Sequence, residues 1–245
     1  MPSLYGGDVP LSPDPAPAPR LADGMPDAVP DAVAEALVKP RLRGVLHQIA
    51  FFVSLLTGGL LIAAADQPGE RIPVVIYSIA ISGLFGVSAL FHRITWRPAA
   101  RRWMRRADHS MIFFAIAGTN TAIAGLALEG GARTAVLSLV WAGAGVGVVM
   151  KLLWLDAPKW VIALSYVVLG WVSVGFVPQF YDGLGAGGFT LMAAGGLLYT
   201  VGAVVYARRR PDPVPAVFGY HEVFHALVIA AAICHYSVVA FSALS

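Results

Sequence analysis

The chain has 245 residues, of which 58% are apolar and 13% are charged, whereas an average soluble domain has about 25% charged residues. Its formal net charge of +3 requires no nucleic-acid partner, and its one cysteine, Cys234, excludes a disulfide framework within the chain and a cysteine-pair metal site. These values exclude an ordinary soluble domain and indicate a chain built mainly from membrane-spanning segments.

The first 38 residues differ from the rest of the chain. They hold eight of the seventeen prolines, mixed with Asp, Ala and Gly, and show no apolar period. This composition predicts a disordered, solvated tail over residues 1–38, ahead of a membrane domain over residues 39–245. The tail lacks the basic start and apolar core of a secretory signal. A partner-docking role for it is the less favoured alternative.

Seven later stretches are long and apolar enough to cross a bilayer, which requires about 20 residues. Segments rich in Pro, Gly and charge separate them. The sequence therefore predicts an all-α fold, a bundle of seven transmembrane helices. The predicted spans are residues 44–65, 72–92, 108–128, 132–151, 159–178, 186–207 and 219–243.

Lysine and arginine are distributed unevenly among the predicted loops. If the N-terminus is cytoplasmic, fourteen of them flank the cytoplasmic segments, whereas the external loops hold only Arg71 and Arg133. Cytoplasmic loops of membrane proteins carry an excess of basic residues. The distribution therefore predicts a cytoplasmic N-terminus and an external C-terminus. We expect the arginine-rich segment 93–106 to contact anionic lipid headgroups rather than nucleic acid.

Five polar residues fall near one depth in this topology, close to the cytoplasmic ends of three spans. Ionisable groups inside spans are costly and mark functional sites by default. The residues are Ser88, His92, Asp108, His221 and His225.

The spacing of these residues favours a metal site. His221 and His225 belong to an H-E-x-x-H pattern and share one helix face, as residues four apart do. With His92 they supply three imidazoles, a common ligand set for catalytic zinc, which activates water at neutral pH. Asp108 is the expected proton acceptor, and Ser88 the expected hydrogen-bond donor to water or substrate. Less specific roles remain open: a serine that bonds its own backbone and an aspartate that caps a helix.

Other polar residues in the spans have simpler interpretations. His235 lies ten residues beyond His225, about 15 Å along a helix, so we expect it to pack or bond a neighbouring helix. His47 and His109 are expected beside the site or at the interface. The segment Thr119-Asn120-Thr121 is expected to form interhelical hydrogen bonds, with substrate contact as the alternative.

Three phrases, SALFHR, ADHSMIFFAIAGTNT and GYHEVFHALVIAAAICHY, together resemble the progestin and adipoQ receptor (PAQR) superfamily, and its bacterial hemolysin III branch fits best. The resemblance covers residues 40–245. It implies a zinc ion near the cytoplasmic face, with ligands His92, His221 and His225 and with Ser88 and Asp108 completing the site. It also implies an integral protein of the bacterial cytoplasmic (inner) membrane that has a membrane lipid as substrate or ligand.

Several functions fit these residues. The first is a zinc-dependent hydrolase of a lipid amide or ester, based on the open set of three histidines with one carboxylate. The resemblance agrees with it, since adiponectin receptors of this superfamily are thought to hydrolyse ceramide. The second is a non-enzymatic membrane sensor or homeostasis regulator with structural zinc. An intramembrane metalloprotease with Glu222 as base ranks third, because adiponectin receptors have a glutamine-like residue at that position. A cytolysin ranks last, since the predicted spans carry no rings of charge.

Overall fold

The computed structural model describes residues 39–244, so the predicted disordered tail of residues 1–38 lies outside the described residues. Within residues 39–244 the regular structure is helical, apart from an isolated bridge between Val214 and Phe218. The prediction of an all-α fold is therefore confirmed for the described part of the chain.

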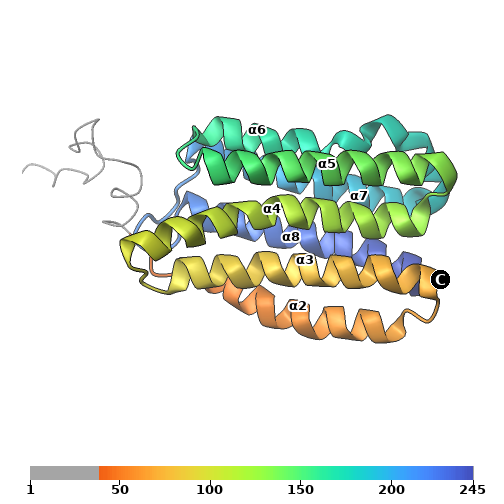
Figure 1. Cartoon of the computed structure of the whole chain (residues 1–245). Helices are drawn as coiled ribbons and strands as arrows, with labels where there is room; N and C mark the ends of the chain where they lie inside the picture. The colour runs from red at the N-terminus through yellow and green to blue at the C-terminus, as the bar shows by residue number, and fades with distance from the viewer. Residues whose placement is uncertain (1–38, 245) are drawn as a thin grey trace, which may run out of the picture. The chain divides into compact units, whose positions relative to one another are not determined.

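The helices follow one another with short connections and pack lengthwise into a bundle (Figure 1). By length and composition, six helical stretches within residues 39–244 can cross a membrane, and the stretch Lys159–Arg208 counts as one of them. The elements are α2 (Val45–Ala64), α3 (Pro68–Arg93), α4 (Pro98–Ala127), α5 (Gly130–Leu153), α6 (Lys159–Gly170), the 3₁₀ helix η1 (Val172–Phe176), α7 (Val177–Arg208) and α8 (Tyr220–Leu244).

The stretch Lys159–Arg208 is not one straight helix. Gly185 interrupts α7 with φ 65° and ψ 175°, a conformation that glycine adopts without steric cost. The Trp171 indole N–H donates to the Thr200 hydroxyl at 2.9 Å, although a continuous helix would separate these residues by about 44 Å. The chain therefore folds back within this stretch, and Figure 1 shows α6 and α7 side by side.

Helix α4 begins ten residues earlier than the predicted span of 108–128. Segment 98–107 is too polar for a hydropathy criterion, yet it is helical, with Pro98 in the first turn and Arg97 as N-cap. Proline suits that position because the first amide of a helix has no partner within the helix. Asp108 consequently lies in the third turn of α4, and its predicted alternative role as an N-cap is wrong.

Helices α3 and α4 form the centre of the bundle. In each, 56% of the spanning window is buried, against 22% for α2. Apolar side chains such as Phe52, Leu56 and Leu60 remain exposed along α2. In a bilayer that surface faces lipid, which is as apolar as the side chains themselves. The polar residues of the predicted site therefore lie on the two most enclosed helices and on α8.

One end of the bundle, here called the histidine end, contains the starts of α2, α4, α6 and α8 and the ends of α3, α5 and α7. Hydrogen bonds join these segments: Arg41 N donates to Ala216 O, Arg105 to Asp156, and the Lys159 ammonium to the Tyr220 hydroxyl. These bonds bring the segment before α2, the α5–α6 connection and the α7–α8 connection to the same end of the bundle.

Candidate metal centre

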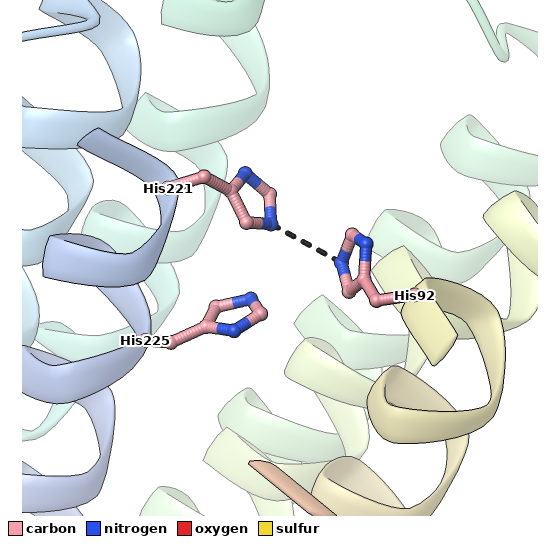
Figure 2. A group of neighbouring side chains, drawn as sticks. All are labelled: His92, His221 and His225. Atoms are coloured by element: carbon pink, nitrogen blue, oxygen red, sulfur yellow. Dashed lines mark hydrogen bonds between the residues drawn. The ribbon is translucent and has the colours of Figure 1, made fainter. Parts of the chain in front are cut away.

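Three buried histidines lie together at the histidine end (Figure 2). His92 comes from the last turn of α3, and His221 and His225 come from the first two turns of α8. The i,i+4 spacing places both α8 imidazoles on the face directed at α3. Centroid separations are 4.7 Å for His92–His221, 5.2 Å for His92–His225 and 4.5 Å for His221–His225.

The arrangement of nitrogens suits a metal ion. One ligand nitrogen from each ring lies within 4.8 Å of the other two, and the Nε2 atoms of His92 and His221 are 3.1 Å apart. The Nδ1 atoms of His221 and His225 are buried without a hydrogen-bond partner among the described residues. Buried polar atoms rarely lack partners, and three neutral imidazoles suit first-row divalent metals. The three histidines could therefore hold a metal.

Asp108 and Ser88 lie beside the histidines. Asp108 Oδ2 is 3.9 Å from His92 Nε2, which is beyond direct hydrogen-bond distance, and Ser88 lies one turn from His92 on α3. Both side chains are buried, and both line one cavity together with His221 and His225. The structure thus brings the five predicted residues together, whereas their roles in metal binding and catalysis stay predictions.

His47 lies directly beside the cluster, which is one of the two positions expected for it from the sequence. Its ring stacks on His225 at a centroid distance of 3.7 Å and an interplanar angle of 9°. Both ring nitrogens of His47 are buried without a hydrogen-bond partner among the described residues. The stack fixes the orientation of the His225 ring. A histidine near the start of the first span was the only sequence signal for this contact.

Glu222, the glutamate of H-E-x-x-H, is held by the segment before α2. Its Oε1 accepts from the Arg43 guanidinium, and its Oε2 accepts from the Gly219 backbone N–H at 2.9 Å. The second bond is the glutamate half of a capping box, which satisfies a free amide at the start of α8. Sequence analysis missed the ion pair because it used Arg43 only to predict topology.

Gly44 connects this ion pair to the cluster. It has φ +80°, and a Cβ added there would lie 2.7 Å from the Cβ of His92. A left-handed backbone and a close approach both favour glycine. The chain can therefore turn from Arg43 into α2 directly against the last turn of α3, which brings His47 to the cluster.

An internal cavity extends from the cluster along α8. Ser88, Asp108, His221 and His225 line one part of it, and His235 lines it further along the helix. Its lining is mainly apolar, so the histidines contact a hydrophobic compartment inside the bundle. Apolar lining residues between these parts include Leu84, Ile112, Ile116, Val167 and Val228.

The remaining polar predictions can be compared with the structure. His235 Nε2 lies 3.1 Å from the Met192 carbonyl oxygen on α7, so the expected bond to a neighbouring helix is confirmed. Interhelical bonding by the segment Thr119-Asn120-Thr121 is also confirmed for Asn120 and Thr121. The Trp141 indole donates to the Thr121 hydroxyl, and the Ser173 hydroxyl donates to Asn120 Oδ1.

Fold and site define an all-helical integral membrane protein with a buried cluster of three histidines suited to a metal. A family model described as "Haemolysin-III related" matches residues 35–236. The chain belongs to this hemolysin III family, which is part of the PAQR superfamily.

Two bacterial relatives illustrate the similarity. The chain is 28% identical over 165 residues to "Hemolysin-3" of Bacillus cereus, an alignment that covers 66% of this chain and 75% of the relative. It is also 28% identical over 188 residues to "Hemolysin-3 homolog" of Bacillus subtilis (strain 168), which covers 76% of this chain and 85% of that protein.

Proposed function

We propose that this protein is a zinc-dependent hydrolase of a lipid amide or ester, located in the bacterial cytoplasmic membrane. The observation that carries the proposal is the position of the cluster: two of its imidazoles, a carboxylate and a hydroxyl line one part of an apolar cavity, and a nitrogen of the third imidazole lies within 4.8 Å of theirs. An acyl chain suits the apolar part, and a carbonyl group suits the polar part.

Each residue has a role that follows from its chemistry. His92, His221 and His225 hold zinc, which when bound supplies Lewis acidity and activates water. Asp108 accepts the proton of the attacking water as general base. The Ser88 hydroxyl donates a hydrogen bond to the substrate carbonyl oxygen. The apolar walls exclude bulk water and hold the acyl chain.

Glu222 is disfavoured as a protease base. Both of its oxygens accept hydrogen bonds, one from Arg43 and one from Gly219, so the carboxylate is directed at the start of α8 and the segment before α2. This geometry supports a positioning role for Glu222 and Asp108 as the base.

A lipid hydrolase should release fatty acid from a member of a panel of ceramides, phospholipids and acyl amides. We expect Asp108→Asn to lower this rate by about 10²–10⁴-fold, the usual contribution of a general base, while metal content is unchanged. Fatty-acid release and bound metal are measured on the same purified sample. Asp156→Asn is the control, because Asp156 is an exposed carboxylate at the same end of the bundle.

Retained metal without turnover of any panel member would contradict the hydrolase. It would favour the sensor with structural zinc, for which the structure offers one specific observation: the ligands connect α3 to the last helix, α8. If zinc is structural in this way, its removal by a chelator should lower the thermal stability of the protein sharply.

We also propose seven spans, with the N-terminus and the histidine end in the cytoplasm. The fold-back within Lys159–Arg208 supports the count, because α6 begins and α7 ends at the histidine end. The basic residues support the orientation. Arg41, Arg105 and Lys159 bond at the histidine end, whereas Arg133 bonds Leu128 O near the start of α5, at the opposite end.

Cysteine labelling in intact cells tests this topology, with Cys234 first replaced by alanine. A membrane-impermeant thiol reagent should label single cysteines at Asp66 and Asp182, and should not label those at Asp156 and Asp212. All four positions are exposed. Labelling at Asp66 together with protection at Asp182 would disprove seven spans. Labelling at Asp156 and Asp212 together with protection at Asp66 and Asp182 would disprove the orientation.

A further inference from the structure

His235 has one hydrogen-bonding atom that the bundle does not use. A carbonyl oxygen can only accept, so the bond to Met192 O requires that His235 Nε2 carries the proton. In the neutral ring Nδ1 is then an acceptor. This Nδ1 is buried and has no hydrogen-bond partner among the described residues. A buried acceptor left without a donor is costly, which makes this atom a candidate for ligand binding.

His235 Nδ1 belongs to a side chain that lines the cavity far from the histidine cluster. His235 lines the same cavity as His221 and His225, and it lies about 15 Å beyond His225 along α8 because each residue advances the helix by about 1.5 Å. The walls of the cavity are mainly apolar. A ligand that occupies the whole cavity therefore meets a polar group at the cluster, an apolar passage, and a second polar group at His235.

Two polar side chains that line the same cavity, Thr200 and Asn120, are already engaged. The Thr200 hydroxyl donates to Gly196 O and accepts from the Trp171 indole. Asn120 donates to Ile116 O and accepts from the Ser173 hydroxyl. These bonds fix their side chains, whereas His235 Nδ1 keeps an unused lone pair.

We propose that His235 forms a second polar subsite, which accepts a hydrogen bond from a hydroxyl or amide N–H on the chain of a lipid. This subsite selects lipids that carry such a donor about 15 Å from the group bound at the histidine cluster. The identity of the ligand as a hydrolysable lipid rests on the proposed function, whereas the subsite itself rests on the geometry of His235.

Selectivity follows from the cost of an unpaired acceptor. A lipid with an unsubstituted methyl end leaves His235 Nδ1 without a donor, whereas a hydroxyl at the same place satisfies it. Sites built to bond a ligand hydroxyl discriminate against the analogue that lacks it. One net hydrogen bond corresponds to about tenfold in affinity.

Binding of fatty acids to the purified full-length chain tests the subsite. Unsubstituted fatty acids and their ω-hydroxy derivatives are compared over a series of chain lengths by isothermal titration calorimetry. We expect the hydroxy acid to bind about tenfold more tightly at one length, with a smaller preference at shorter and longer ones. Equal affinities at every length, or no detectable binding of either acid, would overturn the proposal without any variant.

The variant His235→Leu removes the acceptor and keeps an apolar side chain of moderate size. It should abolish the hydroxyl preference, bind the unsubstituted acid at least as well, and retain the metal. Ser237→Ala on the same helix is the control, because Ser237 does not line the cavity and its hydroxyl bonds only the Ile233 backbone oxygen among the described residues. A preference that persists in His235→Leu would assign it to another group.

Fatty-acid release measured on the same samples separates the two proposals. Hydroxyl selectivity without turnover of any lipid would retain the subsite and reject the hydrolase. Turnover without selectivity at any chain length would retain the hydrolase and reject the subsite.

Discussion

Purified protein should contain about one metal ion per chain, and His92→Ala and His221→Ala should each lose it. The cluster takes ligands from two helices, and an open site with three histidines cannot keep its geometry with two. A free metal concentration a thousandfold above the dissociation constant adds about 4 kcal/mol to the free energy of unfolding. Chelation should therefore lower the melting temperature of the wild-type protein. Elemental analysis identifies the metal, and thermal unfolding with and without chelator measures its contribution.

His235→Ala is the matched control for this experiment. His235 lies on the same helix as His221, and both are buried, with exposed fractions of 8% and 4%. It should keep the metal, because its nearest polar partner is Met192 O on α7. Equal loss of metal from His92, His221 and His235 variants would point to general misfolding. A wild-type protein that stays metal-free in zinc-supplemented medium would remove the basis of the proposed metal centre.

Much of the fold could be predicted from hydropathy and from the Pro, Gly and charged residues that separate the apolar stretches. The ends of α2, α3, α5 and α8 lie within a few residues of the predicted span ends. A membrane helix must form all of its backbone hydrogen bonds internally over the width of the bilayer, so an apolar stretch of that length is helical. The start of α4 was not predictable in this way, since residues 98–107 are helical outside the apolar stretch. Hydropathy locates the lipid-embedded part of a helix and carries no information about where the helix begins in water.

The association of the site residues was predictable because the helices alternate in direction. Once the spans are assigned, residues at the ends of α3 and at the starts of α4 and α8 must lie at one end of the bundle. The ring stack of His47 on His225 was not predictable, because it depends on how α2 rotates and approaches α8. The same applies to His235, since its tautomer follows only from the contact with Met192 O.

The H-E-x-x-H pattern illustrates how little a motif says without its surroundings. Successive residues of an α-helix differ by about 100° in direction, so Glu222 does not share the face of His221 and His225. That difference directs Glu222 to Arg43 while the two histidines face His92. A pattern typical of metalloproteases here combines two candidate ligands with a glutamate that anchors the N-terminal segment to α8.

Removing the carboxylate of Glu222 should be among the most destabilising substitutions at the histidine end. The Arg43 and Glu222 side chains are 7% and 1% exposed, so Glu222→Ala removes the Glu222 carboxylate from a buried guanidinium. Breaking a buried ion pair from one side costs about 3–5 kcal/mol. Glu222→Gln should cost less, because an amide oxygen still accepts a hydrogen bond. The free energy of unfolding, measured by denaturant titration in detergent micelles, quantifies both changes.

A double variant separates the ion pair from general damage to α8. Arg43→Leu with Glu222→Leu leaves neither charge buried, so it should be more stable than Glu222→Ala, as hydrophobic replacement of buried pairs often is. Glu129→Ala is the neutral control, since Glu129 is exposed and makes no side-chain cap, and its effect should be within about 0.5 kcal/mol. If Glu222→Ala proved as mild as Glu129→Ala, the ion pair would not hold the N-terminal segment against α8. If Glu222→Gln abolished turnover without loss of stability, Glu222 rather than Asp108 would be the base.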